Sequence, residues 1–185
     1  VAPSVAQAGV STNAGVVSNY VFRGLQQTQK SGPQIQFGAD YENDSGIYVG
    51  LWGSTLFDDS IADGGAGDSL EIDVYAGWGG EFDGISLGAG VTYYGYTDKD
   101  WDEGYQEVNL SAGYGPFGLG VDLGEDLNLD TDSGYAVYTL SLDMGVIGAE
   151  GMGISYGAIK SDGEDGHATY VDVGYAGSLD MGVDI

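Results

Sequence analysis

Apolar and polar residues alternate strictly from Ser69 to Glu81. A period of two over this length predicts an extended strand with one apolar and one polar face. The apolar face of this stretch collects Leu70, Ile72, Val74, Ala76 and Trp78. The same alternation predicts further strands over residues 10–25, 34–41, 47–57, 85–96, 105–114, 117–124, 138–144, 152–158, 169–175 and 181–185.

The segments between these strands are alternately short and long. The short ones cover residues 42–46, 82–84, 115–116, 145–151 and 177–180, and the long ones cover residues 26–33, 58–68, 97–104, 125–134 and 160–166. Tight turns on one side and longer loops on the other are typical of an up-and-down antiparallel β-barrel of the outer-membrane type. We therefore predict an all-β fold in which residues 10–185 form a single barrel of about 10–12 strands. Residues 1–9 are expected to form an N-terminal tail.

Aromatic residues on the apolar face indicate which face meets lipid. One set comes just before the short turns and another lies near the long loops; together they are Tyr41, Trp78, Tyr114 and Tyr175, and Phe22, Phe57 and Tyr93. Two aromatic bands around an aliphatic belt match the two interfaces of a bilayer. In a soluble barrel such as a lipocalin the apolar face would instead point inward. The polar face is rich in Gly and Ser, and the chain has few of the Lys residues that a soluble exterior usually carries. Together with the aromatic girdle, this favours a membrane barrel.

The charge narrows the classes of partner. The 185 residues include 29 acidic and 4 basic side chains, a formal charge of −25. Nucleic-acid binding is excluded because phosphates need Lys and Arg to neutralise them, whereas affinity for cations or life in high salt is favoured. Cysteine is absent, which excludes disulfides and thiolate metal sites.

The polar face carries one arginine among many carboxylates. The predicted lumen charge cluster consists of Arg23, Asp40, Glu71, Asp73, Glu107, Asp122, Asp143 and Asp172. We favour the interpretation that Arg23 neutralises two or three of these carboxylates and pins the strand register. The alternative is a charged constriction in a cation-preferring pore.

Catalytic and metal-binding patterns are weak. The single histidine, His167, has no accompanying G-x-S-x-G motif, and the acidic pairs are too numerous to indicate glycosidase chemistry. We therefore expect no enzyme, no catalytic residue and no resident cofactor. One long loop places oxygen ligands at Asp126, Asn128, Asp130 and Asp132 but lacks the terminal Glu of an EF-hand. A Ca²⁺ site there is an alternative to plain solvated loops, which we favour.

Residues 18–28 read SNYVFRGLQQT. This stretch resembles the N-terminal strand of the Gcw_chp family of uncharacterised proteobacterial proteins, whose members carry a similar S-x-Y-V-F-R-G-x-x-Q-T segment. Further similarity runs through residues 36–41, 46–50 and 69–77. The resemblance implies a β-barrel in the outer membrane of a Gram-negative bacterium and leaves the activity open.

Two functions follow from these patterns. The first is an outer-membrane barrel that acts as a narrow or plugged, cation-leaning channel or as a structural surface protein, with the lipid bilayer as its partner. Bulky residues on the polar face, Tyr48, Trp52, Tyr75 and Tyr94, argue against a wide channel. The second is a self-assembling surface filament protein, because a short last strand leaves an edge to which a neighbour's tail can add.

Overall fold

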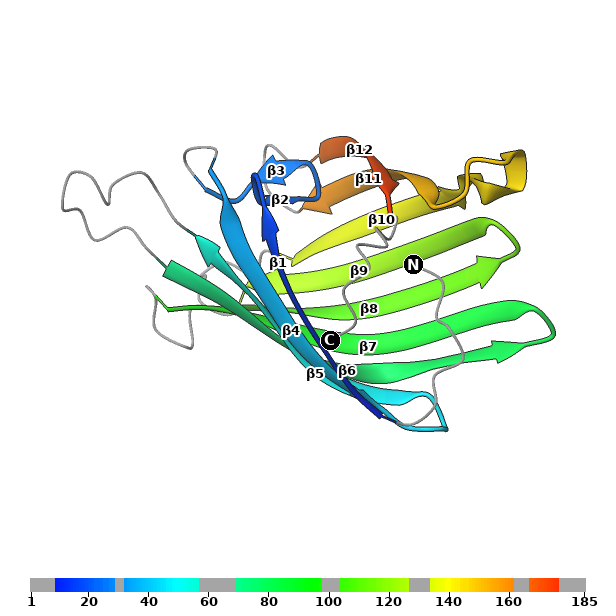
Figure 1. Cartoon of the computed structure of the whole chain (residues 1–185), viewed down its shortest axis with the longest axis horizontal. Coiled ribbons are helices and arrows are strands. Elements are labelled where there is room, and N and C mark those ends of the chain that lie inside the picture. The colour runs from blue at the N-terminus through cyan, green and yellow to red at the C-terminus, as the bar shows by residue number, and fades with distance from the viewer. Residues whose placement is uncertain are drawn as a thin grey trace, which may run out of the picture.

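The computed structural model describes residues 9–28, 32–56, 69–97, 104–126, 134–161 and 167–176. Within these ranges ten strands form one antiparallel sheet in which each strand pairs with the next along the chain (Figure 1). The strands are β1 (Gly9–Val17), β4 (Gln34–Glu42), β5 (Ile47–Leu56), β6 (Ser69–Phe82), β7 (Ile85–Tyr96), β8 (Tyr105–Tyr114), β9 (Phe117–Asp126), β10 (Gly134–Asp143), β11 (Met152–Ser161) and β12 (His167–Tyr175). The predicted all-β antiparallel fold is confirmed.

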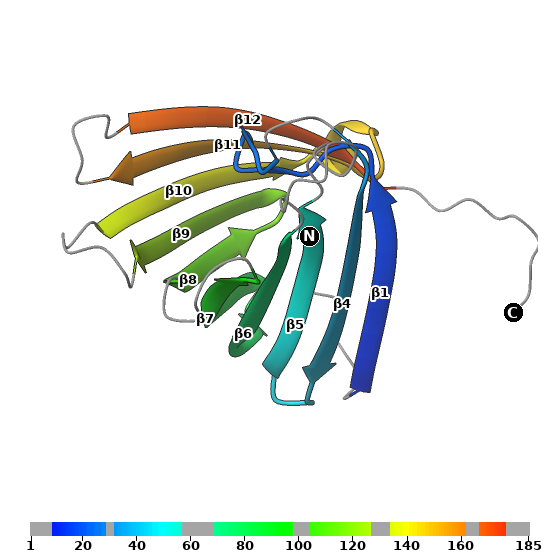
Figure 2. The ribbon, with the colours of Figure 1, turned by 90° about the vertical axis from the view of Figure 1, so that its left-hand side faces the viewer.

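The sheet is strongly curved and has β1 and β12 at its two edges (Figure 2). Among the described residues no pairing joins β1 to β12, so closure into a barrel stays a prediction. The eleventh predicted strand, residues 181–185, and residues 1–8 of the predicted tail lie outside the described ranges, whereas Gly9, the last residue of that tail, begins β1. The part of the chain that the structure describes contains no helix long and apolar enough to cross a membrane.

The first predicted strand is corrected by the structure. Residues 10–25 alternate as one strand would, but β1 ends at Val17 and a separate hairpin follows, formed by β2 (Val21–Phe22) and β3 (Leu25–Gln26). Its two central residues, Arg23 and Gly24, have φ angles of 51° and 78°. Positive φ at both positions is the requirement of a type I′ turn, which reverses the chain within two residues. Alternation alone missed the break because the period of two continues through it.

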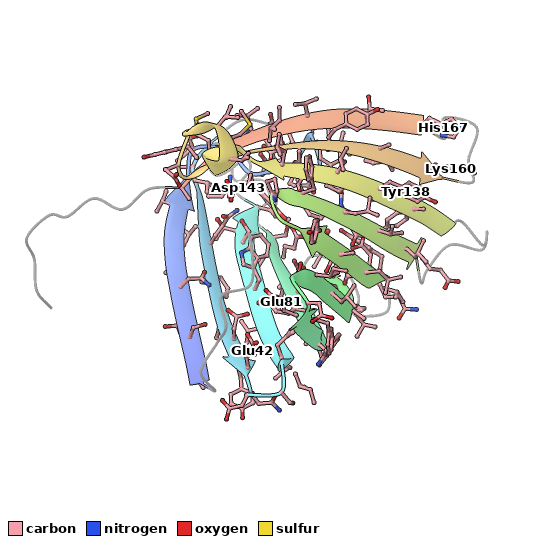
Figure 3. All side chains as sticks on the ribbon, turned by 90° about the vertical axis from the view of Figure 1, so that its right-hand side faces the viewer. Glu42, Glu81, Tyr138, Asp143, Lys160 and His167 are labelled. Carbon is pink, nitrogen blue, oxygen red and sulfur yellow. The ribbon has the colours of Figure 1, made fainter. Side chains whose placement is uncertain are left out.

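Burial is inverted with respect to an ordinary globular protein. Apolar side chains in mid-strand are open to the surroundings: Val74 is 44% exposed, Leu110 is 44% and Leu140 is 56%. The carboxylates of the opposite face are enclosed, since Glu71 and Glu107 are 1% and 2% exposed. Figure 3 shows side chains standing on both faces of the curved sheet. The polar face is therefore the enclosed face, on the concave side of the sheet.

Glycines on the concave face make room for tyrosine rings. Gly124 pairs across the ladder with Tyr135, and Gly157 pairs with Tyr170. A Cβ atom at either glycine would fall 2.0 Å from the ring of its partner. Each ring therefore lies flat over its glycine, an arrangement that lets bulky side chains fill a narrow interior.

Candidate functional site

The hairpin β2–β3 lies on the concave side and contacts strands that are distant in sequence. The Phe22 ring lies 6.0 Å from the ring of Tyr94 on β7, measured between centroids. The Tyr20 ring, just before the hairpin, lies 5.4 Å from that of Trp52 on β5. Tyr20 and Tyr94 are each only 7% exposed. These contacts place the hairpin in the half of the sheet that adjoins the long loops.

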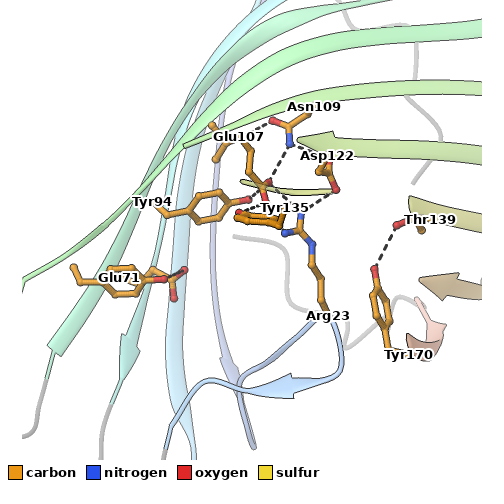
Figure 4. A network of polar contacts seen from close by, with 11 residues as sticks. Arg23, Glu71, Tyr94, Glu107, Asn109, Asp122, Tyr135, Thr139 and Tyr170 are labelled. Carbon is orange, nitrogen blue, oxygen red and sulfur yellow. Dashed lines mark hydrogen bonds and ion pairs between the residues drawn. The ribbon is translucent and has the colours of Figure 1, made fainter. Parts of the chain in front are cut away.

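Arg23 at the hairpin tip joins two strands of the sheet. Its Nη1 and Nη2 atoms donate to Glu107 Oε1 and Oε2 at 2.5 and 3.0 Å, and Nη2 also donates to Asp122 Oδ2 at 2.8 Å (Figure 4). Glu107 belongs to β8 and Asp122 to β9. A bidentate guanidinium–carboxylate pair is among the strongest and most directional contacts available to side chains.

Neutral donors complete the shell around Glu107. The hydroxyls of Tyr94 and Tyr135 donate to its two oxygens at 2.9 and 2.7 Å. Asn109 Nδ2 donates both to Glu107 Oε2, at 3.2 Å, and to Asp122 Oδ1, at 2.9 Å. The side chain of Glu107 is fully enclosed, and that of Arg23 is 14% exposed. Every oxygen of this buried carboxylate is therefore satisfied, as a buried charge requires.

The guanidinium of Arg23 is held in its charged form. Burial by itself lowers the pKa of Arg23, but the hydrogen bonds and the charge of Glu107 outweigh burial and raise the pKa above its ordinary value. The carbon at the centre of the guanidinium also lies 4.5 Å from the centroid of the Phe22 ring, a favourable cation–π contact. Arg23 therefore carries a permanent positive charge into an acidic interior.

Two further members of the predicted charge cluster lie beside this network without joining it. Glu71 and Asp73 come from β6 and are 1% and 7% exposed. The hydroxyl of Tyr96 donates to Glu71 Oε1 at 3.4 Å. Glu71 Oε2 and Asp73 Oδ1 have no hydrogen-bond partner in the described part of the chain.

The remaining carboxylates of the predicted cluster lie elsewhere. Asp40 accepts a hydrogen bond from the Tyr75 hydroxyl, on strands β4 and β6. Asp143 is exposed and caps the short 3-10 turn η3 (Met144–Ile147), where it accepts from the Gly145 amide at 2.8 Å. Asp172 on the edge strand β12 is exposed. The predicted single cluster is thus corrected to one ion-pair network, one buried acidic pair and three separate carboxylates.

The predicted aromatic girdle is found in part on the exposed face. Tyr41, Tyr114 and Tyr175 are 46%, 69% and 74% exposed. Trp78 bonds through Nε1 to the carbonyl of Ser45 in the β4–β5 turn, at 2.9 Å, and Tyr93 is half-buried. Phe22 is a correction: it belongs to the inward hairpin and not to a strand of the large sheet, so it contacts Tyr94. Phe57 lies outside the described residues.

The predicted calcium loop lies outside the described residues, which do not include Asn128, Asp130, Asp132 or the side chain of Asp126. Within the described ranges no three Asp, Glu, His or Cys side chains come together so as to hold a metal ion.

Sequence reasoning missed the uncharged members of the Arg23 network: Tyr94, Tyr135 and Asn109. The sequence predicts Tyr94 only as a bulky inward residue. All three occupy polar-face positions, and Tyr94 and Tyr135 lie near the long-loop ends of their strands, which is a usable sequence signal. Only the cross-strand register, which pairs Tyr94 with Tyr105 and Asn109 with Asp122, brings them together.

A family model described as a bacterial protein of unknown function (Gcw_chp) matches residues 2–182. The chain belongs to the Gcw_chp family. No curated protein and no solved structure matches it. In this Gcw_chp protein, residues 18–28, which carry the resemblance, run through the inward hairpin from Tyr20 to Thr28. Tyr20, Phe22 and Arg23 of that segment are therefore among the side chains that fill the enclosed face of the sheet.

Proposed function

We propose that this chain is an outer-membrane β-barrel whose interior is narrowed by the β2–β3 hairpin and favours cations. The observation that carries the proposal is the inverted burial. Leu110 and Leu140 are 44% and 56% exposed while Glu107 is 2% exposed. Exposure of mid-strand aliphatic side chains to water is unfavourable in free energy, whereas their contact with acyl chains carries no such cost.

Strand length supports the same proposal. The strands of the large sheet have 9 to 14 residues, and a tilted spanning strand needs about 9–11 residues. Three of the exposed tyrosines, Tyr41, Tyr114 and Tyr175, lie at the end of the sheet where the turns are short, while Tyr138 and Tyr156 are exposed in mid-strand. Tyrosine is enriched where hydrocarbon meets the headgroups. We assign the short-turn end to the periplasmic side and the long loops to the outside of a Gram-negative outer membrane.

The hairpin supports a narrow rather than an open interior. It occupies the long-loop half, where Phe22 lies against Tyr94 and Arg23 is bound to β8 and β9. The enclosed face carries Asp40, Glu71, Asp73, Glu107 and Asp122 against the single guanidinium of Arg23. A surplus of fixed negative charge in a restricted space lowers the energy of cations and raises that of anions.

A charge placed on the exposed face tests the membrane assignment. Leu110 lies in the middle of β8, so Leu110→Arg is expected to impair insertion into lipid vesicles by about 2–4 kcal/mol. The matched variant Phe117→Arg, at the short-turn end of β9, is expected to cost about 0–1 kcal/mol because interfaces tolerate charge. Folding into vesicles is followed by the heat-dependent shift in gel mobility and by protease protection. If Leu110→Arg inserts as well as wild type, the bilayer assignment is wrong.

Planar-bilayer recording tests the channel assignment separately. The expected result is a small conductance with a reversal potential on the cation-selective side. Absent or anion-selective conductance in protein that has demonstrably inserted would remove the channel and leave a structural surface protein.

A second function is favoured by the two edges of the sheet. The described parts of β1 and β12 each pair on one side only, and an unpaired edge can accept a strand from another copy. Self-assembly into surface filaments is therefore the alternative proposal. Electron microscopy of the purified protein distinguishes the two: filaments support assembly, and detergent-bound monomers alone contradict it.

A further inference from the structure

Two buried carboxylate oxygens lack the partners that buried charges need. Glu71 is 1% exposed and Asp73 is 7% exposed. Glu71 Oε2 and Asp73 Oδ1 are enclosed and accept no hydrogen bond from any described residue. An ionised carboxylate that is buried and unpaired is strongly destabilising, so such a group either takes up a proton or binds a counter-charge.

The ladder shows what surrounds this pair. Asp73 lies between Trp52 on β5 and Tyr94 on β7, while Glu71 lies between Ser54 and Tyr96 on the same two strands. Directly opposed residues on one face have Cβ atoms about 4.5–5.5 Å apart. None of these four neighbours carries a positive charge. The pair therefore occupies a row of aromatic rings and hydroxyls on the enclosed face.

The positive charge of Arg23 serves other residues. Each Arg23 donor drawn in Figure 4 points at Glu107 or Asp122, and Glu71 lies to one side of that network. The arginine sits at a turn whose backbone conformation is costly for a bulky residue, with φ of 51°. It cannot swing toward Glu71 without giving up its bidentate pair. Arg23 thus supplies no counter-charge to the acidic pair, which is neutralised either by protons or by a cation from outside the described chain.

We propose that Glu71 and Asp73 bind one divalent, oxygen-preferring metal ion of the Ca²⁺ class inside the molecule. Two carboxylates carry a charge of −2, which one divalent ion neutralises. Hard cations of this class take carboxylate and hydroxyl oxygens together with water. Two carboxylates supply only part of such a shell, so water and a hydroxyl such as that of Ser54 complete it. An organic ammonium ion is disfavoured because its single charge would leave the pair with a net charge of −1.

Thermal unfolding in detergent tests this site. Wild-type protein is expected to gain about 5–10 °C in Tm when the chelator is replaced by calcium at ~100 times its Kd. The double variant Glu71→Gln/Asp73→Asn should show no gain. In chelator it should melt above wild type, because the unpaired charges are gone.

A matched control separates this site from the general acidity of the chain. The double variant Glu81→Gln/Asp172→Asn removes the same two charges from exposed positions and should keep the full calcium gain. Sodium chloride at equal ionic strength should give no comparable rise in wild type. An equal rise with sodium, or a calcium gain that survives in Glu71→Gln/Asp73→Asn, would overturn the site, since screening or the loops would then account for the effect.

Terbium provides a readout that does not depend on any variant folding. It replaces calcium, and its emission is sensitised by nearby indole and phenol rings. Trp52 and Tyr96 flank the pair, so excitation of these rings should give terbium emission that calcium displaces stoichiometrically. Absence of sensitised emission from folded wild-type protein would contradict the proposal. These measurements need no bilayer, so the site can stand if Leu110→Arg disproves the membrane assignment, and can fail if that assignment holds.

Discussion

Arg23 donates two hydrogen bonds to the carboxylate of Glu107, a residue 84 positions further along the chain. One residue belongs to a two-residue turn and the other to the middle of the sheet, so their pairing fixes a local hairpin onto a long-range structure. Because the Glu107 side chain is fully enclosed, neither residue can lose the other without leaving a buried charge. The pair is the anchor by which the hairpin narrows the enclosed face.

Arg23→Asn is expected to release the hairpin. Asn tolerates positive φ better than Arg, so the turn itself should be preserved or improved. The loss of the guanidinium leaves Glu107 uncompensated, which should reduce the free energy of unfolding by about 3–5 kcal/mol. Urea unfolding in detergent measures this, and bilayer recording should show increased conductance. Lys160→Gln, which removes an exposed positive charge from β11, should change neither; an equal effect there would point to net charge alone.

The double variant Arg23→Asn/Glu107→Gln should be less destabilised than the sum of its single variants. Replacing both charges removes the penalty of an unpaired one, so a coupling energy of about 0.5–3 kcal/mol is expected for residues in contact. The four unfolding free energies of the cycle give this value directly. Strict additivity would mean that the hairpin is held by Phe22 and Tyr20 and that the ion pair contributes nothing net.

Gly24→Ala should displace the hairpin tip from β12. A Cβ at Gly24 would lie 2.7 Å from the Cβ of Tyr170, and the residue has φ of +78°. Gly84 is a matched position, with φ of +79° and only one atom of Tyr114, at 3.9 Å, near a new Cβ. Gly84→Ala should cost about 1–2 kcal/mol for backbone strain alone. Gly24→Ala should cost about 1–3 kcal/mol more for the clash, and equal losses in unfolding free energy would show that the tip is not packed on β12.

Gly124→Ala should break the hydrogen bond from Tyr135 to Glu107. The new Cβ would fall 2.0 Å from the Tyr135 ring, so the ring must move, at a cost of about 1–3 kcal/mol. Gly120→Ala, on the same strand and face, meets only Thr139 Cβ at 3.6 Å and should be neutral or stabilising by up to about 1 kcal/mol. Combining Gly124→Ala with Tyr135→Phe should add little further loss, since the first change already removes the contact. Full additivity would contradict this assignment.

The sequence by itself determined the strands and their two faces. Alternation is a local property, and a residue's side of a strand depends only on its parity. The ranges predicted for β5, β7 and β8 therefore differ from the observed ones by at most one residue, and Glu71, Glu107 and Asp122 were placed on the correct face. The alternation of short turns and long loops between these strands also predicted the antiparallel all-β fold class.

Only the tertiary structure decided which polar residues meet. The partner of Arg23 depends on a turn at Arg23–Gly24 that interrupts an unbroken alternation, and on how far the curved sheet brings β8 and β9 toward that turn. Neither is a local property of the chain. The isolation of Glu71 and Asp73 has the same origin, because a carboxylate lacks a partner only when every neighbouring strand has been placed. The odd or even position of a residue in its strand fixes the face on which its side chain lies. The curvature of the sheet and the register between strands fix which side chains it contacts.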